Sequence, residues 1–325
     1  MTPLLSKHRK IEIAYGSVVI AVVVFVLSSL RFFVHYYPIE LFHHFQVQYF
    51  IASVVILIVL AALRRWRFVI IAIAAVIVSS SAVIPLWFRP HDVDSSTTAT
   101  QLTSTIRILH ANVLSSNADH AKLIDLINRE KPDLVMLQEI NSHWVKALTP
   151  LENDYPYKCI AARDDNFGIA IFSRTPLHAT VVQQFGSANF PSITFQIQID
   201  NTFVDVISTH PMPPVSADAM ASHNEQLLAV AAFAEGRENP LIVVGDLNTT
   251  MWTGPYNNLC EKLNLTNARK GFGILPGWPT SLPGIMRIPI DHCLVSDEVF
   301  ISDCRLGSEI GSDHLPLIID FQIRR

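Results

Sequence analysis

Three long runs of uncharged, apolar residues constrain this chain more than any other feature. They are Ile13–Leu30, Val47–Leu63 and Phe68–Phe88, with 18, 17 and 21 residues. Because a helix rises about 1.5 Å per residue, roughly 20 residues are needed to cross a bilayer core. A helix that is apolar on every side for this length is rarely buried in a soluble core. We therefore predict three transmembrane helices at about 13–30, 47–63 and 68–88, within a membrane anchor of residues 1–91.

Basic residues flank these runs in an alternating pattern. In chain order they are Lys7, Arg9 and Lys10, then Arg31, then Arg64, Arg65 and Arg67, and finally Arg89. Lys and Arg accumulate in loops on the cytoplasmic side. The pattern predicts a multi-pass protein of the inner (cytoplasmic) membrane with its N-terminus in the cytoplasm. Everything after Arg89 would then lie on the extracytoplasmic side.

A polar stretch separates the apolar runs from the remainder of the chain. Residues 92–104 are rich in Ser and Thr and show no periodicity, which is typical of a linker. Residues 105–325 are long enough for one large domain. We therefore expect a second domain that is held close to the membrane surface.

The charge of this second domain argues against a polyanionic partner. Of the 24 Lys/Arg and 28 Asp/Glu residues, eight and two lie in residues 1–91, which leaves 16 basic and 26 acidic residues in residues 92–325, a net charge of about −10. Such a domain repels a nucleic acid unless a local basic groove overrides the field. The sequence therefore disfavours nucleic acid as a partner.

The four cysteines carry no metal or redox motif. Cys159, Cys260, Cys293 and Cys304 form no C-x-x-C pair. They are expected to be small buried residues, and a disulfide would require that the domain face an oxidising compartment.

Strand-like and helix-like patterns alternate from residue 105 onward. Two segments have helical spacing, Asp119–Lys131 and Ala219–Phe233. Strands are expected at Ile106–Val113, Leu134–Leu137, Gly168–Ser173, Ser192–Ile199, Phe203–Ser208, Leu241–Val244, Asp291–Val295 and Leu315–Ile323. Dominant strands with interspersed helices favour a layered α/β domain.

Polar side chains appear abruptly at the ends of these apolar strands. They are Asn112, Gln138, Glu139, His210, Asp246, Asn248, Asp291, Asp313 and His314. Any one of them is an ordinary turn or capping residue. Six such places in one domain instead indicate a site built at strand ends.

The order of these motifs resembles the endonuclease/exonuclease/phosphatase superfamily. The segments are NV at 112–113, PDLVMLQEI at 132–140, GIAIFSR at 168–174, STHPMPP at 208–214, VVGDLNT at 243–249, IDHCLVS at 290–296 and GSDHLPL at 311–317. The HPMPP run, and Trp278-Pro279 followed by PIDH at 289–292, resemble membrane-anchored bacterial members. The resemblance implies a four-layered α/β sandwich of two mixed β-sheets flanked by helices over residues 105–325.

The resemblance also implies a metal centre. Phosphate ester hydrolysis needs charge neutralisation and an activated water, and Mg²⁺ prefers carboxylate oxygens. By this resemblance Glu139 is the main ligand of Mg²⁺, with Mn²⁺ as the alternative ion. Asn112 and Asp313 lie at or beside the metal.

The remaining motif residues take catalytic roles in the same scheme. Asp246 and Asn248 are two apart on a segment expected to be extended, so both can face one side. The resemblance assigns the attacking water to Asp246 and a phosphate oxygen to Asn248. His314 would pair with Asp291, and either His314 or Asp246 would take the proton of the water. His210 would stabilise the transition state or protonate the leaving group.

Three functions are compatible with the sequence. The first is a membrane-anchored Mg²⁺-dependent phosphoesterase that hydrolyses a phosphate ester or pyrophosphate of a membrane lipid. The apolar loop Gly271–Ile288 could shelter the lipid chain. The second is a membrane-bound endo- or exonuclease, and the third is a non-catalytic binding protein on the same fold. The tether and the acidic charge favour the first.

Overall fold

The computed structural model describes residues 7–89 and 102–324. The chain forms two compact units. The first comprises Met1–Trp87 together with Trp252–Gly254, and the second comprises Phe88–Met251 and Pro255–Arg325. Most of the predicted linker, residues 92–101, lies outside the described residues.

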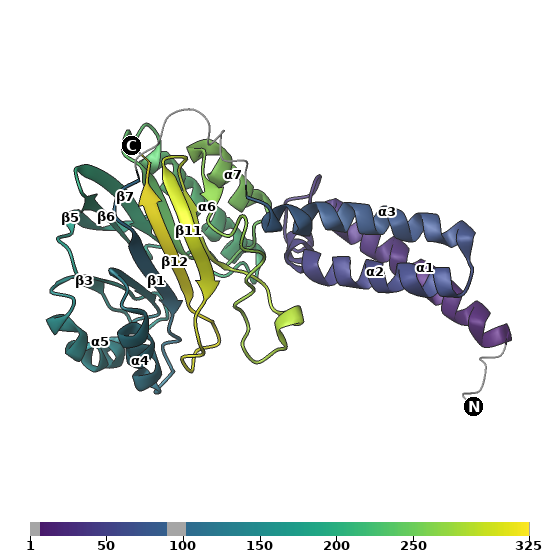
Figure 1. Ribbon diagram of the computed structural model, residues 1–325, viewed down its shortest axis with the longest axis horizontal. Coiled ribbons are helices and arrows are strands. Elements are labelled where there is room, and N and C mark those ends of the chain that lie inside the picture. The colour runs from purple at the N-terminus through teal and green to yellow at the C-terminus, as the bar shows by residue number, and fades with distance from the viewer. Residues whose placement is uncertain (1–6, 90–101, 325) are drawn as a thin grey trace. The chain divides into compact units, whose positions relative to one another are not determined.

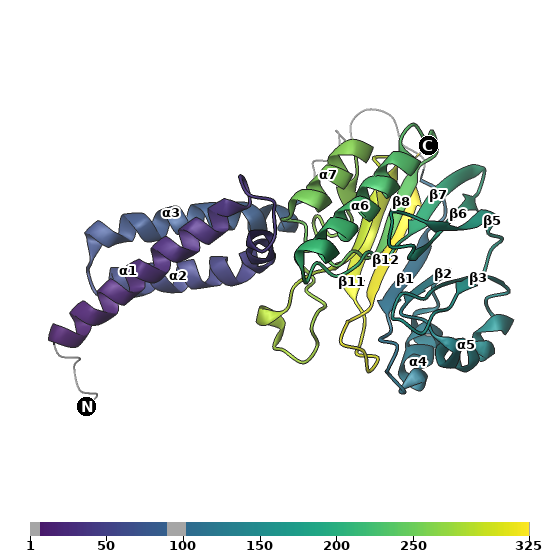
Figure 2. The same ribbon diagram turned by 180° about the vertical axis from the view of Figure 1, so that it is seen from behind.

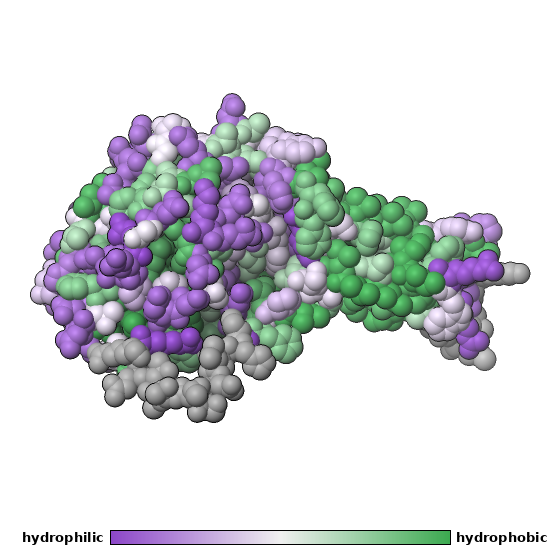
Figure 3. All heavy atoms as spheres, turned by 90° about the horizontal axis from the view of Figure 1, so that it is seen from above, coloured by the Kyte–Doolittle hydropathy of each residue, from purple (hydrophilic) through white to green (hydrophobic). Residues whose placement is uncertain are grey.

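Within residues 7–89, the first unit is helical throughout its long apolar segments. Its α-helices are α1 (Lys7–Leu30), α2 (Gln46–Ala62) and α3 (Trp66–Val83), with the short 3₁₀ helices η1 (Ile39–Phe45) and η2 (Ile84–Trp87). Three segments are long and apolar enough to cross a membrane by length and composition. The outer surface of this unit is mostly hydrophobic, whereas polar residues cover much of the visible face of the second unit (Figure 3).

Several polar side chains near the helix interfaces of the first unit are buried and bond one another. Ser53 Oγ and Ser79 Oγ lie 3.1 Å apart between α2 and α3. Arg31, at the end of α1, donates to Gln46 Oε1 at 2.6 Å and to Ser81 Oγ at 2.6 Å. Because lipid tails offer no hydrogen-bond partners, such groups are stabilised only inside the helix bundle.

The second unit contains two six-stranded mixed sheets (Figures 1 and 2). The first sheet has the order β11-β12-β1-β2-β4-β3, and the second has the order β5-β6-β7-β8-β10-β9. The strands are β1 (Ile106–Asn112), β2 (Leu134–Gln138), β3 (Tyr157–Ala161), β4 (Ile169–Ser173), β5 (His178–Gln184), β6 (Pro191–Ile199), β7 (Thr202–Ser208), β8 (Leu241–Asp246), β9 (Thr266–Asn267), β10 (Asp291–Val295), β11 (Val299–Leu306) and β12 (Leu317–Ile323).

Alternating side chains along these strands build three apolar layers. Ile108, Met136 and Val244 lie in the core between the two sheets. The opposite face of the first sheet packs on α4 (His120–Glu130) and α5 (Ser142–Ala147). The opposite face of the second sheet packs on α6 (Ala217–Ala234) and α7 (Gly254–Leu263). The predicted four-layered sandwich is therefore confirmed.

Two parallel strand pairs define the functional edge of the sandwich. Asn112 of β1 is in register with Gln138 of β2, and Ser208 of β7 is in register with Val244 of β8. Parallel strands end at the same edge of a sheet, so the residues that follow them converge. The antiparallel partner β10 begins at Asp291, directly opposite Asp246 at the end of β8.

Candidate active site

Gln138 connects the two sheets at this edge. Its side-chain oxygen accepts from the backbone N–H of Asp246 at 2.7 Å, and its Nε2 donates to Thr209 O at 2.7 Å. Gly245 permits this approach, because a Cβ there would lie 1.9 Å from Thr209 O and 2.7 Å from Gln138 Nε2. Gln138 therefore positions the end of β8 against the end of β2.

Glu139 and Asn112 form the first part of the site. Asn112 Nδ2 donates to Glu139 Oε1 at 2.9 Å, and the N–H of Ser115 donates to Glu139 Oε2 at 3.1 Å. Glu139 is partly exposed and has a φ of +64°, a left-handed conformation that costs a non-glycine residue about 1–2 kcal/mol. The turn places this carboxylate at the surface of the site, where it retains lone pairs for a ligand.

Asp246 lies at the centre of the site and is buried. Its Oδ2 accepts from Asn112 Nδ2 at 3.1 Å, and it lies 3.5 Å from His314 Nε2 and 3.6 Å from His210 Nε2. Burial raises the pKa of the Asp246 carboxyl. Burial lowers the pKa of His210. These contacts join Asn112, Glu139, His210, Asp246 and His314 into one connected group of predicted residues.

The predicted pairing of His314 with Asp291 is present. His314 Nδ1 donates to Asp291 Oδ2 at 2.9 Å. Burial opposes charge on His314, but Asp291 and Asp246 outweigh it and raise its pKa to about 10. Burial also opposes charge on Asp291, yet His314 and His110 hold the pKa of that carboxyl well below its usual range.

His110 is a member of the site that the sequence reasoning missed. Its Nε2 donates to Asp291 Oδ1 at 3.1 Å, so two imidazoles hold one carboxylate. His110 precedes Asn112 by two positions on β1. Because side chains two apart on a strand share a face, this spacing was the signal that could have found it.

Asn248 departs from the sequence-based expectation. We expected an extended segment through Asp246 and Asn248, but β8 ends at Asp246 and Asn248 has a φ of +50°. Asp246 Oδ1 instead accepts from the N–H of Asn248 at 2.9 Å, as in an Asx turn. Asn248 Nδ2 donates to Pro211 O at 2.9 Å, which connects this turn to the segment after His210.

Asp313 contacts the apolar loop before β10. Trp278 Nε1 donates to Asp313 Oδ2 at 3.1 Å, and the N–H of Thr280 donates to Asp313 O at 2.9 Å. Within the described residues, no hydrogen bond joins Asp313 to Glu139. Asp313 is half-buried beside His314, so the structure brings it to the rim of the site.

Two sets of atoms could hold a metal ion here. One is the oxygen set that the sequence predicted, Glu139 with Asn112 and Asp313. The other consists of Asp246, Asp291 and His314, whose ligand atoms lie within 4.8 Å of one another. The second set is already joined by the His314–Asp291 hydrogen bond and is fully buried, whereas Glu139 is open to a ligand. Carboxylate and amide oxygens suit a hard divalent cation, so the Glu139 set fits Mg²⁺ better.

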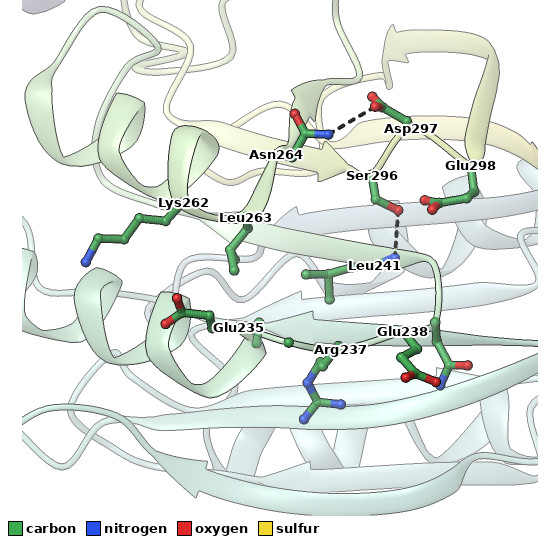
Figure 4. A pocket seen from close by; sticks show the side chains of 13 residues that line it. Glu235, Arg237, Glu238, Leu241, Lys262, Leu263, Asn264, Ser296, Asp297 and Glu298 are labelled. Carbon is green, nitrogen blue, oxygen red and sulfur yellow. Dashed lines mark hydrogen bonds between the residues drawn. The ribbon is translucent and has the colours of Figure 1, made fainter.

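A surface pocket of about 290 Å³ lies at the other end of β8 and is separate from this site. It is lined by Leu241 at the start of β8, by Glu235 and Arg237 after α6, and by Lys262 of α7 (Figure 4). Because the converging residues follow the end of β8, the chemistry is concentrated at the opposite edge.

Comparison with known proteins identifies the class to which this fold and site belong. A model described as the Endonuclease/Exonuclease/phosphatase family matches residues 109–314. The chain therefore belongs to the endonuclease/exonuclease/phosphatase family, whose superfamily members are hydrolases that act on phosphate esters. Enzymes of this superfamily are typically dependent on a divalent metal.

Several solved structures share the fold at low sequence identity. The endonuclease/exonuclease/phosphatase from Bacteroides vulgatus has a TM-score of 0.57 and 15% identity, and covers 68% of this chain and 100% of that chain. The protein of the same description from Beutenbergia cavernae DSM 12333 has a TM-score of 0.54 and 18% identity, covering 68% and 72%. D. rerio TDP2 complexed with single strand DNA product has a TM-score of 0.57 and 18% identity, covering 67% and 99%. No match was found among curated proteins.

Proposed function

We propose that this protein is a membrane-anchored, Mg²⁺-dependent phosphoesterase that hydrolyses a phosphate ester or pyrophosphate of a membrane lipid. The observation that carries the proposal is the convergence of Asn112, Glu139, His210, Asp246 and His314 at one edge of the sandwich. The same chain carries three helices of membrane-spanning length and composition.

The metal would be held by Glu139 with Asn112, and by Asp313 at the rim. When bound, the ion neutralises phosphate charge and lowers the pKa of water. Asn112 keeps the Glu139 carboxylate oriented through its 2.9 Å hydrogen bond. Glu139 would therefore be the residue whose loss is most damaging.

Asp246 would accept the proton of the attacking water. Its Oδ2 faces the imidazoles of His210 and His314, which hold the carboxylate in place for this transfer. His314 has Asp291 on its Nδ1 side, so its Nε2 N–H points toward Asp246 and the reacting centre. His210 would stabilise the charge on the phosphate or protonate the leaving oxygen.

The lipid substrate follows from tethering and charge. The stretch between Trp87 and Leu102 spans at most about 50 Å even when fully extended, so the domain remains near the bilayer. Tethering raises the effective concentration of membrane substrates. The charge of about −10 over residues 92–325 disfavours long polyanions, whereas one phosphate group needs only local neutralisation.

The sidedness of the active site is part of this proposal. The basic flanks favour an N-terminus in the cytoplasm, so the catalytic domain would lie on the extracytoplasmic side of the inner membrane. If all three helices cross, the loop between α1 and α2 lies on the same side as the domain that follows α3, because two spans separate them.

The proposal is tested with the purified full-length protein in liposomes containing Mg²⁺. Phosphate release is measured in parallel from a polyprenyl pyrophosphate, a phospholipid and single-stranded DNA. We expect turnover of a lipid substrate that is lost in EDTA and falls by about 10²-fold or more in Glu139→Ala, a magnitude typical for the loss of an electrostatic stabiliser. Glu235→Ala, at the remote pocket, is the matched control and should retain activity.

Two outcomes would contradict the proposal. Full activity in EDTA would exclude the metal-dependent mechanism. DNA cleavage without lipid turnover would instead support a membrane-bound nuclease, a function consistent with the fold shared with D. rerio TDP2, which was solved with a single strand DNA product.

A further inference from the structure

A second cluster of ligand-type side chains lies in the first unit, between α1 and α2. His35 follows α1, whereas Glu40 and His43 belong to the 3₁₀ helix η1. Residues three apart in a helical turn share a face, so Glu40 and His43 can act together. Neither the family fold nor the proposed hydrolysis uses these residues.

Two of the three side chains are buried without adequate partners. Glu40 is 2% exposed and His43 is 0% exposed. Among the residues that the structure describes, Glu40 Oε2 and both ring nitrogens of His43 have no hydrogen-bond partner. Glu40 Oε1 accepts from the N–H of Gly254 at 2.9 Å. An unpaired buried imidazole and a half-satisfied carboxylate are costly, and nearly all buried polar groups in proteins have partners.

The ligand atoms of the cluster lie close enough together to share one metal ion. One ligand atom from each of His35, Glu40 and His43 lies within 4.8 Å of the others. The His35 and His43 rings meet edge to face, with centroids 5.9 Å apart. Ligands about 2.1 Å from a tetrahedral ion are about 3.4 Å apart, so side-chain shifts of about 1 Å would close the cluster on an ion.

The charges around the cluster leave the Glu40 carboxylate unneutralised. Within the described part of the chain, Glu40 forms no ion pair. The neighbouring cation, Arg31, is instead held by neutral acceptors: Gln46 Oε1, Ser81 Oγ and Val78 O. A divalent cation bound between Glu40 and the two imidazoles would satisfy Glu40 Oε2 and one of the two unpartnered ring nitrogens of His43.

We propose that His35, Glu40 and His43 bind a divalent transition metal ion, with Zn²⁺ as the ion that suits the ligand set. Two imidazoles and one carboxylate are a recurring Zn²⁺ set that leaves a fourth position open. Mg²⁺ prefers an all-oxygen shell, so this site would differ in ion preference from the Glu139 site. His35 is exposed and offers the ion a path from solvent.

Cobalt binding to the full-length protein in detergent tests this site independently of catalysis. The protein carries Glu139→Ala to weaken the catalytic metal site, and it is stripped with EDTA and dialysed before titration. We expect one equivalent of Co²⁺ to bind with visible d–d absorption and to be displaced by Zn²⁺. Adding His43→Ala should abolish this absorption and weaken binding by about 10²-fold or more. His8→Ala, near the start of α1, is the matched control and should change neither.

A conservative exchange separates loss of a ligand from loss of folding. His43→Cys retains a transition-metal ligand and should restore binding, with an added thiolate-to-cobalt charge-transfer band. Helix content by circular dichroism should be the same in all variants. The proposal would be overturned if the protein that retains His43 bound neither Co²⁺ nor Zn²⁺. It would also be overturned if binding survived both Glu40→Gln and His43→Ala.

Discussion

The surroundings of two neighbouring residues on β10 keep Asp291 ionised and His292 neutral. Asp291 faces the active-site edge, where His110 and His314 stabilise its negative charge. His292 faces the other side of the sheet, where Nε2 donates to Thr249 O at 2.8 Å and Nδ1 lies 3.4 Å from Arg269 Nη1. Burial first, and then Arg269, lower the pKa of His292 to about 3. Its neutral form therefore stabilises the fold.

This environment predicts that acid destabilises the catalytic unit through His292. The unfolded chain gains a proton near pH 6.5, whereas folded His292 remains neutral until about pH 3. Because the folded pKa is depressed, this contribution is complete above pH 6.5 and is lost as the pH falls toward 3. Between pH 6.5 and 5 the loss is about 2 kcal/mol.

Calorimetry of the full-length protein in detergent measures this effect. The melting temperature of the catalytic unit should fall less steeply from pH 7 to 5 in His292→Gln than in the unmodified protein. The comparison uses the slope of melting temperature against pH, because the substitution also changes packing and so shifts the melting temperature at every pH. His143→Gln, at an exposed position, is the control, and an unchanged slope in His292→Gln would contradict the prediction.

At the scale of elements, the loop between β9 and β10 extends from the active-site edge. The backbones of Trp278 and Ile288 bond each other twice, at 2.6 and 3.2 Å, and close the loop. Its tip, the 3₁₀ helix η4 (Gly284–Met286), exposes Ile285 and Met286, and Leu282 is also exposed. The base of the loop contacts Asp313 through Trp278. Substitutions at the tip and at the base of the loop should therefore affect activity differently.

We predict that Leu282→Ser with Ile285→Ser impairs lipid hydrolysis more than hydrolysis of a small soluble phosphoester. The two exposed side chains would contact the lipid, and each buried aliphatic side chain contributes about 1.5–3 kcal/mol. The ratio of kcat/KM for the lipid to that for the soluble substrate should fall by about 10-fold or more.

Trp278→Phe is the comparison for this prediction. It removes the 3.1 Å hydrogen bond to Asp313 and should lower activity on both substrates to a similar extent. If the Leu282 and Ile285 variant also loses both activities equally, the tip of the loop has no specific role in lipid binding.

At the scale of the whole molecule, the chain combines apolar helices of membrane-spanning length with an acidic domain of the endonuclease/exonuclease/phosphatase family. The exposed residues of α1, α2 and α3 include Val19, Val55 and Ile70, which suit contact with lipid. The charge of about −10 over residues 92–325 disfavours binding of long polyanions such as nucleic acid.

The alternating basic loops predict an extracytoplasmic catalytic domain. A phosphatase reporter, which requires an oxidising compartment, should be active when fused after Arg89 and inactive when fused after Arg65. A fluorescent reporter that folds only in the cytoplasm should give the opposite pattern at both positions. Reversed activities would place the catalytic domain in the cytoplasm.

Local chemistry was sufficient for much of this fold. The apolar runs predicted the membrane-length helices, because length and hydropathy are properties of contiguous residues. The strands at Leu134–Leu137 and Leu241–Val244 were found because buried central strands are continuously apolar. Exposed or irregular strands escaped detection, among them β5 with its alternating exposure and β9 with only two residues.

The site was predictable only where a motif held its residues together. Glu139, Asp246 and His314 each stand in such a motif. The sequence by itself therefore determined the family resemblance and identified these three residues as candidates for the site. Only the tertiary structure placed His110 on Asp291, Gln138 between the sheets, and His35 beside Glu40 and His43. The contacts of His110 and Gln138 depend on which strands pair. The contact of His35 with Glu40 and His43 depends on the conformation of the connection between α1 and α2. Pairing is decided by the summed burial of both sheets, which no single segment encodes.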